Sequence, residues 1–582
     1  MATGIAMNQR WARRETPPTR RAIQLGLSGG VMALLVCLIG LVNAFSKRFI
    51  INDVLTTAQA ILAIIVLITG YMAAARTWKR GQPAATAIVY GALAGLMVGV
   101  VLAALVLIGS AVNLREVLVN ATPALYGILT FEQESQGVGL GMLLLATGVL
   151  GLLGALLFIL PDRMRNAVLM GFGVLIFVGL LQDLIELVLN RNRGVQRFFY
   201  TSNGLTVTGA LLLFILPFLL RLGWGYVGDR VRSNVEALPP ASRRGLSWAM
   251  TGLGILFLLL FPRIFGSFPS EVMNNVALLG VLMGLGLNIV VGFAGLLDLG
   301  YVGFFAIGAY TMAVLTSPQL NFPIDMGFWQ ALPFAILISI FCGMLLGIPV
   351  LKMRGDYLAI VTLGFGEIIR LLALSDLMRP RLGGAQGVTQ VATANFAGTE
   401  LTTPQTLYYL LLASVALTWF ISRRLRDSRI GRAWMALRED EDVAEAMGIN
   451  LVSTKLMAFG TGAAMAGLGG AIFAAKLQSI APQSFDLLIS INALAIIIIG
   501  GLASIPGVVV GALLLIGVPE LLREFNEYRL WVYGIMMVVM MLFRPEGFWP
   551  EEHRRRELHD TEPGIEDSAT VGMDPAAAPG QS

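Results

Sequence analysis

The chain has 582 residues, of which 56% are hydrophobic and only 13% are charged. A soluble domain carries about a quarter charged residues, so this composition excludes a soluble enzyme, a disordered chain and a coiled coil. It predicts an all-α, polytopic transmembrane helical bundle, because helices satisfy their own backbone hydrogen bonds in lipid. The net charge of +5 does not indicate nucleic-acid binding, because the basic residues lie mostly between apolar runs.

Cysteine and histidine are rare in this chain, and their positions limit the kinds of site that it can hold. The two cysteines, Cys37 and Cys342, each lie inside an apolar run, so no disulfide framework is expected. The two histidines, His553 and His559, both lie in the polar C-terminal tail. No histidine is therefore available at membrane depth as a metal ligand or as an acid or base. We expect no metal site, no cofactor and no catalytic residues.

The first part of the chain is expected to hold a cytoplasmic basic N-terminus (1–21) and an accessory membrane domain (22–222). A span needs about 20 apolar residues. The six candidate spans are Ala22–Phe45, Val54–Ala75, Ala84–Val112, Val138–Leu160, Ala167–Leu189 and Leu205–Leu220. Most loop charges fit a cytoplasmic N-terminus, whereas the pair Lys47–Arg48 and the arginines of 191–197 do not.

A polar stretch, Gly223–Gly245, contains Pro239 and Pro240 and predicts a cytoplasmic linker. The following region, 246–544, is expected to hold about ten spans, about 16 in all. The candidates are Leu246–Phe261, Asn275–Gly292, Leu299–Thr316, Phe328–Leu351, Tyr357–Ser375, Leu407–Ile421, Lys455–Ala475, Leu487–Gly501, Ile505–Leu522 and Leu530–Phe543. An even number of spans returns the C-terminus to the cytoplasm, and the tail 545–582 is expected to be disordered.

Small residues follow a four-residue period at Gly91, Gly95 and Gly99. This spacing lets two helix backbones approach closely in lipid. We interpret it as packing within the chain rather than as a dimerisation face.

A few acidic residues lie in or near apolar spans, where ionisable groups are costly and often functional. Asp183 and Glu186 share one helix face, and with Asp298 and Glu367 they are the candidate relay of an ion- or proton-coupled secondary transporter. For the first two we favour a solvated position at a span end, because arginines follow at once. The secondary transporter is the competing class of function.

The most charged segment between two spans is Ser422–Asn450. Ile430, Trp434 and Leu437 form an apolar stripe at helical spacing. An acidic cluster then precedes Gly448, as expected for a helix start and a helix end. The pattern predicts two short helices on the cytoplasmic face. Because helices of about ten residues are marginal alone, they need a docking surface on their own domain or on a partner.

No G-x-x-x-x-G-K-[ST] pattern, which would mark a phosphate-binding loop, occurs in the sequence. If ATP drives transport, another polypeptide must therefore hydrolyse it.

Four segments resemble a known family, in the order of that family. They are Gly286–Tyr310 (GLNIVVGFAGLLDLGYVGFFAIGAY), Gly355–Arg370 (GDYLAIVTLGFGEIIR), Arg429–Asn450 followed by Ala463–Ala474 (AAMAGLGGAIFA), and Phe543–Gly547 (FRPEG). Together they resemble the permeases of binding-protein-dependent ABC importers for branched-chain amino acids. The resemblance covers about residues 246–550, so residues 1–245 stay without an expected function.

The resemblance implies a permease subunit in the cell inner membrane that pairs with a second homologous permease subunit. It also implies ABC ATPase subunits on the cytoplasmic side and an extracytoplasmic substrate-binding protein that delivers a small amino-acid cargo. The implied cargo is a branched-chain amino acid such as leucine, isoleucine or valine. Urea and amides are the alternatives, because in such systems the binding protein largely sets selectivity.

Within the charged segment, Asp442-Val443-Ala444 followed by Gly448 resembles the E-A-A-x-x-x-G pattern of ABC importer permeases. Asp442 and Val443 depart from it, and the downstream I-x-L-P element is absent. The resemblance implies that Glu439–Gly448 docks on the ATPase. The coupling residues are Asp442, Val443, Ala444, Glu445, Met447 and Gly448. The three apolar ones are expected on one side, and Gly448 is expected to take a positive φ.

The glycine-rich stretch Gly292–Gly308 is expected to line or abut the cargo route. Closely packed or irregular backbone is tolerated in lipid only where protein or water covers it. The candidate residues are Gly292, Gly295, Gly300, Gly303 and Gly308.

Overall fold

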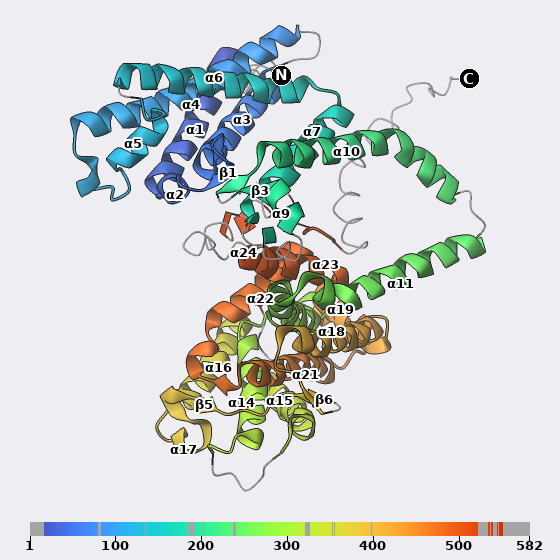
Figure 1. Cartoon of the computed structure of the whole chain (residues 1–582). Coiled ribbons are helices and arrows are strands. Elements are labelled where there is room, and N and C mark those ends of the chain that lie inside the picture. Colours follow the sequence, from blue (N-terminus) through green and yellow to red (C-terminus); the bar gives the residue numbers. More distant parts are fainter. Residues whose placement is uncertain are drawn as a thin grey trace, which may run out of the picture. The chain divides into compact units, whose positions relative to one another are not determined.

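The computed structural model describes residues 17–78, 83–133, 135–182, 185–186, 193–201, 203–236, 240–320, 326–351, 353, 355–396, 398–521, 534–535, 537–538, 540, 544 and 546–550. Helices dominate these residues, which confirms the all-α, polytopic bundle (Figure 1). The chain divides into two compact units, Met1–Ala249 and Met250–Ser582.

The number of spans was expected to be about 16. In the described residues, 13 helices are long and apolar enough to cross a membrane, and two shorter apolar helices lie at Tyr301–Thr316 and Ile505–Leu521. These 15 helices match the first 15 candidate spans. The last candidate, Leu530–Phe543, lies mostly outside the described residues.

Four long helices of the first unit lie side by side: α1 (Pro18–Leu38), α3 (Thr57–Thr77), α4 (Ala84–Ala111) and α6 (Gln136–Ile159) (Figure 1). Gly91, Gly95 and Gly99 lie on the face of α4 that packs on α6. A Cβ atom at each would overlap with α6 atoms, including those of Gly151 and Thr147. Their interpretation as packing positions within the chain is confirmed.

The rest of the first unit consists of a helix pair and short elements. Its helices are α2 (Leu41–Ala44), η1 (Leu114–Glu116), α5 (Pro123–Leu129), α7 (Asp162–Leu180), α9 (Arg193–Phe199) and α10 (Val207–Glu236), and α7 packs on α10. Its strands are β1 (Phe49–Ile51), β2 (Leu55–Thr56), β3 (Tyr200–Thr201) and β4 (Gly204–Leu205). They form a sheet of order β2-β1-β4-β3, antiparallel except for the β1–β4 pair.

The polar stretch expected to be a linker, Gly223–Gly245, is helical over most of its described length. α10 continues through it to Glu236, and α11 (Pro240–Phe265) begins directly at Pro240. The stretch holds no proline before Pro239, so polarity alone does not end the helix. Pro240 suits a first helical position, where the missing N–H would have no helical partner.

The second unit is built around one central span, Ser267–Phe293. It consists of α12 (Ser267–Asn275), η2 (Val276–Leu282), α13 (Met283–Leu287) and η3 (Asn288–Phe293), with π-helical geometry in η2 and η3. The other helices are α14 (Tyr301–Thr316), α15 (Phe328–Val350), α16 (Asp356–Leu374), α17 (Arg379–Leu382), η4 (Gly384–Gln386), α18 (Pro404–Arg426), α19 (Arg429–Glu439), α20 (Glu441–Ala446), α21 (Leu451–Leu477), η5 (Pro482–Ser484), α22 (Leu487–Gly500), α23 (Ile505–Ala512), η6 (Leu513–Gly517) and α24 (Val518–Leu521).

Two small antiparallel pairs connect loops of this unit. β5 (Val388–Thr389) pairs with β8 (Ser479–Ile480), and β6 (Asn395–Phe396) pairs with β7 (Thr399–Glu400). The strands are two residues long, which is too short for a period-2 pattern to show in the sequence.

The long helix α21 packs closely against α14 and α15 (Figure 1). Gly308 of α14 faces Gly467, and Gly343 of α15 faces Ala463, at distances that leave no room for a larger residue. Small residues at helix contacts bring backbones together and maximise packing in lipid. α21 is thus held between two neighbours along much of its length.

A proline in α11 creates a backbone acceptor that a neighbouring helix satisfies. Pro262 has no N–H, so the carbonyl of Leu258, four residues earlier, loses its helical donor. The hydroxyl of Tyr408, on α18, donates a hydrogen bond of 3.0 Å to that carbonyl. The Tyr408 ring also stacks on Phe261. This contact fixes α11 against α18 in the second unit.

Candidate functional site

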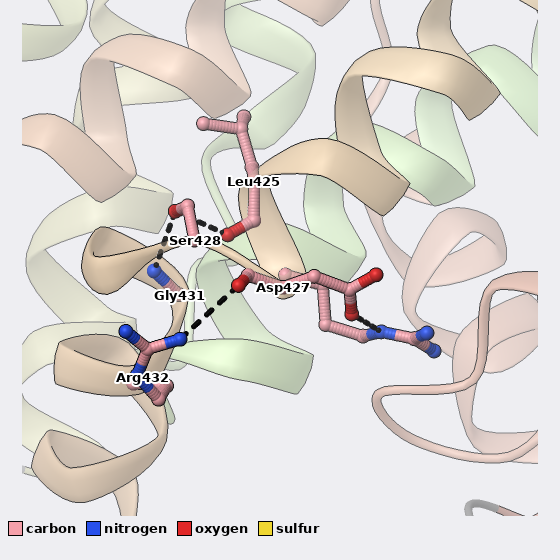
Figure 2. Close-up of polar contacts among 6 residues, drawn as sticks. Leu425, Asp427, Ser428, Gly431 and Arg432 are labelled. Atoms are coloured by element: carbon pink, nitrogen blue, oxygen red, sulfur yellow. Dashed lines mark hydrogen bonds and ion pairs between the residues drawn. The ribbon is translucent and has the colours of Figure 1, made fainter.

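The charged segment leaves α18 through a tight elbow (Figure 2). Ser428 caps α19: its Oγ accepts from Gly431 N at 3.2 Å and donates to Leu425 O at 2.6 Å. The Arg432 side chain donates to Asp427 O at 3.2 Å. A Cβ atom at Gly431 would overlap with the Leu425 carbonyl, so glycine permits the close approach. The elbow fixes the direction in which α19 leaves α18.

Two side chains hold α19 against the membrane helices. Trp434 is fully buried, and its Nε1 donates to Thr454 O at 2.9 Å in the first turn of α21. The Arg438 guanidinium donates to Gly292 O at 2.8 Å, at the end of η3. α19 is therefore attached to two different spans. The expected stripe of Ile430, Trp434 and Leu437 faces the chain's own domain, because the last two are buried and Ile430 packs on the same core.

The two predicted short helices are confirmed as α19 and α20. Asp440 caps α20, because its Oδ1 accepts from Asp442 N at 2.9 Å and from Val443 N at 3.0 Å. Gly448 follows with a φ of +86°, so its predicted positive φ is also confirmed. The sharp ends of α20 thus follow from an acidic cap and a terminal glycine.

The apolar residues of α20 do not all face one way. Ala444 is 3% exposed and packs on its own domain, whereas Val443 is 57% exposed and Met447 is 79% exposed. The expected shared side is therefore corrected: only Val443 and Met447 are available to a partner. The reason is that α20 packs on its own domain through the side that carries the small Ala444. The exposed acidic residues Asp442 and Glu445 accompany them.

The five glycines proposed for the cargo route lie in η3, in the segment that follows it and in α14. Gly292, Gly300, Gly303 and Gly308 are buried, and Gly295 is exposed beside the stem of Arg438 with a φ of +70°. A Cβ atom at Gly300 would overlap with Thr362 O, and Gly303 faces Gly366. The glycines thus mediate close backbone contacts in this conformation. Their part in a cargo route stays a prediction.

Buried polar groups surround the turn between η3 and α14. Asn288 accepts from Ala503 N at 2.9 Å, and Thr362 of α16 accepts from Leu299 N at 3.0 Å. Asp298 is fully buried, and its Oδ1 accepts from Gly300 N at 2.9 Å. Burial raises the pKa of the Asp298 carboxyl to about 7, although the bond from Gly300 opposes the shift.

Of the four relay candidates, the structure describes Glu186 in the first unit and Asp298 and Glu367 in the second. Glu367 pairs with Arg370 on its own helix, with Nε and Oε2 2.9 Å apart. Glu186 accepts from Gln182 at 3.1 Å in the first unit. Asp183 lies outside the described residues. Over the part of the chain that the structure describes, no group of three or more histidine, cysteine or acidic residues is placed to hold a metal ion.

Sequence reasoning missed Arg438 and Lys455 as anchors of the charged segment. Arg438 is one of many arginines there and carries no distinguishing signal. Lys455 did carry one: it lies at the start of an apolar run, and the chain has only five lysines.

Comparison with known proteins places these helices in a family. A family model described as the permease component of branched-chain amino acid transport systems matches residues 271–543. The high-affinity branched-chain amino acid transport system permease protein LivM of Escherichia coli K12 is 38% identical over 377 residues, which cover 57% of this chain and 86% of that protein. The protein of the same name from Salmonella typhimurium LT2 is 42% identical over 372 residues, with the same coverage.

A more distant relative is the high-affinity branched-chain amino acid transport system permease protein LivH of Escherichia coli K12. It is 27% identical over 300 residues, which cover 48% of this chain and 94% of that protein. No solved structure matches the chain.

The helical bundle and these matches define a multi-pass membrane permease. The chain belongs to the family of permease components of branched-chain amino acid transport systems. The family match begins at Glu271, so it lies within the second unit.

Proposed function

We propose that the chain is the permease subunit of an ABC importer that carries branched-chain amino acids into the cytoplasm. ATP would be hydrolysed on separate subunits, since the sequence holds no phosphate-binding loop motif. A second permease subunit would complete the translocation path, and an extracytoplasmic binding protein would deliver the cargo. Transport would follow alternating access, with ATP binding and hydrolysis shifting the balance between two conformations.

In this proposal the chain lies in the cell inner membrane. Both termini lie on the cytoplasmic side, together with α19 and α20. The arginines of the charged segment support this orientation through the positive-inside rule. The opposite end of the second unit, with the β5–β8 and β6–β7 pairs, would then face the binding protein.

The observation that carries the proposal is the form of α20. It is a six-residue helix with a defined cap at each end, and it projects Val443 and Met447 outward from a domain that matches the permease family. Exposed apolar side chains on a short, fixed helix suit insertion into a groove on a partner. The surface formed by Asp442, Val443, Glu445 and Met447 is the proposed docking surface for the ATPase.

The cargo route is proposed to run beside η3 and the start of α14. Gly292, Gly295, Gly300, Gly303 and Gly308 form a stretch with little side-chain bulk, and π-helical geometry in η3 is typical of functional positions in helices. A cysteine placed at Gly303 should react with a small aqueous thiol reagent in at least one state of the transport cycle. Complete protection in every state would leave helix packing as its only role.

The experiment that tests the proposed function is reconstitution. The full chain is co-expressed with its candidate ATPase and second permease subunits, purified as a complex and placed in lipid vesicles. We expect the candidate binding protein and leucine together to stimulate ATP hydrolysis and the uptake of labelled leucine. Labelled urea is the matched cargo control.

Three outcomes would contradict this function. Uptake driven by a pH or ion gradient without any ATPase subunit would favour a secondary transporter. Uptake of urea in place of leucine would change the cargo. The absence of an ATPase from the purified complex would contradict the proposal that the chain is part of an ABC importer.

A further inference from the structure

The long helix α21 carries two of the five lysines in the chain, one near each end. Lys455 lies in the first turns of α21 and is 1% exposed. An ammonium group is very unfavourable away from water unless it is both paired and hydrogen-bonded. The partners of Lys455 therefore determine why a lysine can occupy this position.

Those partners come from two other helices. Lys455 Nζ forms an ion pair with the carboxylate of Glu441, the first residue of α20, and this carboxylate is itself mostly buried. The same Nζ donates to Leu351 O at 3.1 Å, directly after the last residue of α15. The C-terminal end of a helix carries partial negative charge, which favours an ammonium group there. Lys455 thus joins α20, α15 and α21 at one point.

α20 contacts the rest of the second unit through its inward side. Ala444 is its one fully buried residue, and the side chains of Asp442, Val443 and Glu445 are exposed. The inward contacts of α20 thus include the packing of Ala444 and the Glu441–Lys455 ion pair.

We propose that Lys455 is a positioning residue that makes α15 and α21 follow the movements of α20. This inference rests on the proposed function, in which an ATPase subunit docks on α20. Separating two opposite charges inside a protein is strongly unfavourable, so α20 cannot move away from the two spans at low cost. α21 is about 40 Å long and packs closely on α14 and α15, so a displacement of its first turn reaches the opposite end of the bundle.

The test compares Lys455→Met with a matched variant, Lys476→Met, in the full chain purified with its ATPase subunits in lipid vesicles. Methionine keeps the length of the side chain and removes its charge. Lys476 also lies on α21 and also pairs with a glutamate, Glu271, at 2.8 Å, but it lies about 20 residues from Lys455 along the same helix. The readout is the ratio of ATP hydrolysis with leucine and its binding protein to basal hydrolysis.

We expect Lys455→Met to keep the ATPase in the complex, because Val443 and Met447 are untouched, and to lower the stimulation ratio by about fivefold or more. Lys476→Met should keep the ratio near that of the unmodified chain. A merely stabilising lysine would change the yield and the thermal stability of the complex but not this ratio.

An unchanged ratio in Lys455→Met overturns the proposal. So does an equal loss in Lys476→Met, because the stability of α21 would then explain both. If Lys455→Met does not fold, the variant Glu441→Met/Lys455→Met takes its place, since removing both charges leaves neither one buried without its partner. That double variant should assemble with a reduced ratio, and normal stimulation would contradict the proposal. A failure of the unmodified chain to bind an ATPase or to respond to leucine refutes the proposed function itself, and the inference with it.

Discussion

The two units bury their apolar helices to different extents. In the second unit, the most apolar windows of Ser267–Phe293 and Leu451–Leu477 are 83% and 72% buried. In the first unit, the most buried described span, Ala84–Ala111, reaches 50%. The second unit thus has inner helices covered by outer ones, whereas every described span of the first unit keeps a face open.

Buried polar side chains of both units bond within their own helices, as Thr316 and Thr418 of the second unit do, but those of the second unit also join different spans. In the first unit, Thr69 and Thr147 donate to the carbonyl four residues earlier on their own helix. In the second unit, polar groups connect different elements: Tyr301 donates to Gly462 O at 2.9 Å, and Ser490 accepts from Val302 N at 2.9 Å. Hydrogen bonds between helices fix their relative positions, as conformational change between defined states requires. This contrast agrees with a family match confined to the second unit.

The largest effect is expected from enlarging a glycine between two inner helices. Gly308→Leu would force α14 away from α21, because its side chain would meet the backbone of Gly467. We expect loss of leucine uptake and of monodisperse protein in size-exclusion chromatography. Gly364→Leu is the matched control, because a Cβ atom added there meets no atom within 4 Å. The comparison of the units predicts a milder result for Gly95→Leu in α4, with uptake retained.

If Gly95→Leu abolished uptake as completely as Gly308→Leu, close packing in the first unit would be as necessary for transport as close packing in the second. Equal tolerance of Gly308→Leu and Gly364→Leu would show that α14 and α21 can separate without harm.

The next effect is expected at the proposed docking surface. The variant Val443→Glu/Met447→Glu places two more carboxylates on α20 without touching a buried residue. Desolvating an unpaired polar group in an interface costs at least 1–3 kcal/mol, so we expect about tenfold less ATPase to co-purify. Insertion in the membrane should be normal. The matched control is Val117→Glu/Val119→Glu in an exposed loop of the first unit, which should leave the complex intact; equal behaviour of both variants would exclude α20 as the docking element.

The helices could be predicted from the sequence because apolar runs of span length have one stable form in lipid. The caps of α20 could also be predicted, since Asp440 and Gly448 act through local geometry. What could not be predicted depends on neighbours distant in sequence. Ala444 faces inward and Val443 faces outward because α20 packs against α21. The sequence within ten residues of α20 contains no pattern that indicates this packing.

The polar stretch Gly223–Gly245 shows a second limit of prediction from the sequence. Polarity suggested a linker, which stays a prediction, and the structure shows that most of its described residues are helical; arginine and glutamate have helix propensities close to that of leucine. The glycines of Gly292–Gly308 show a third limit. Their spacing indicates close contact, and the structure identifies the contacting atoms as Thr362 O and Gly467 O, whereas a transport role depends on states other than this one.

The thermal stability of the second unit should depend on pH through the buried Asp298. The pKa of Asp298 is raised to about 7 by burial, so the folded chain holds a proton that the unfolded chain releases near pH 4. Stability from this group is fully present below about pH 4 and is lost as the pH rises through about 7. Asp298→Asn should therefore raise the melting temperature by a few degrees at pH 8 and by clearly less at pH 5. Equal shifts at the two pH values would contradict a protonated Asp298.

The smallest effect is expected from removing the first unit. A chain that begins at Ser242 keeps most of α11 and all family-matched residues. Because the second unit contains its own inner helices and its own hydrogen bonds between them, we expect insertion, ATPase binding and leucine uptake close to those of the full chain.

The matched control begins at Gly266 and lacks α11 as well. It leaves the hydroxyls of Tyr408 and Tyr409 without the carbonyls of Leu258 and Leu259, to which they donate at 3.0 Å. In lipid these hydroxyls have no water to replace the lost acceptors, so the shorter chain should be less stable in a thermal scan and yield less folded protein. If the chain from Ser242 behaved like the chain from Gly266, the first unit would be required for the second to fold, and the division of labour between the two units would have to be abandoned.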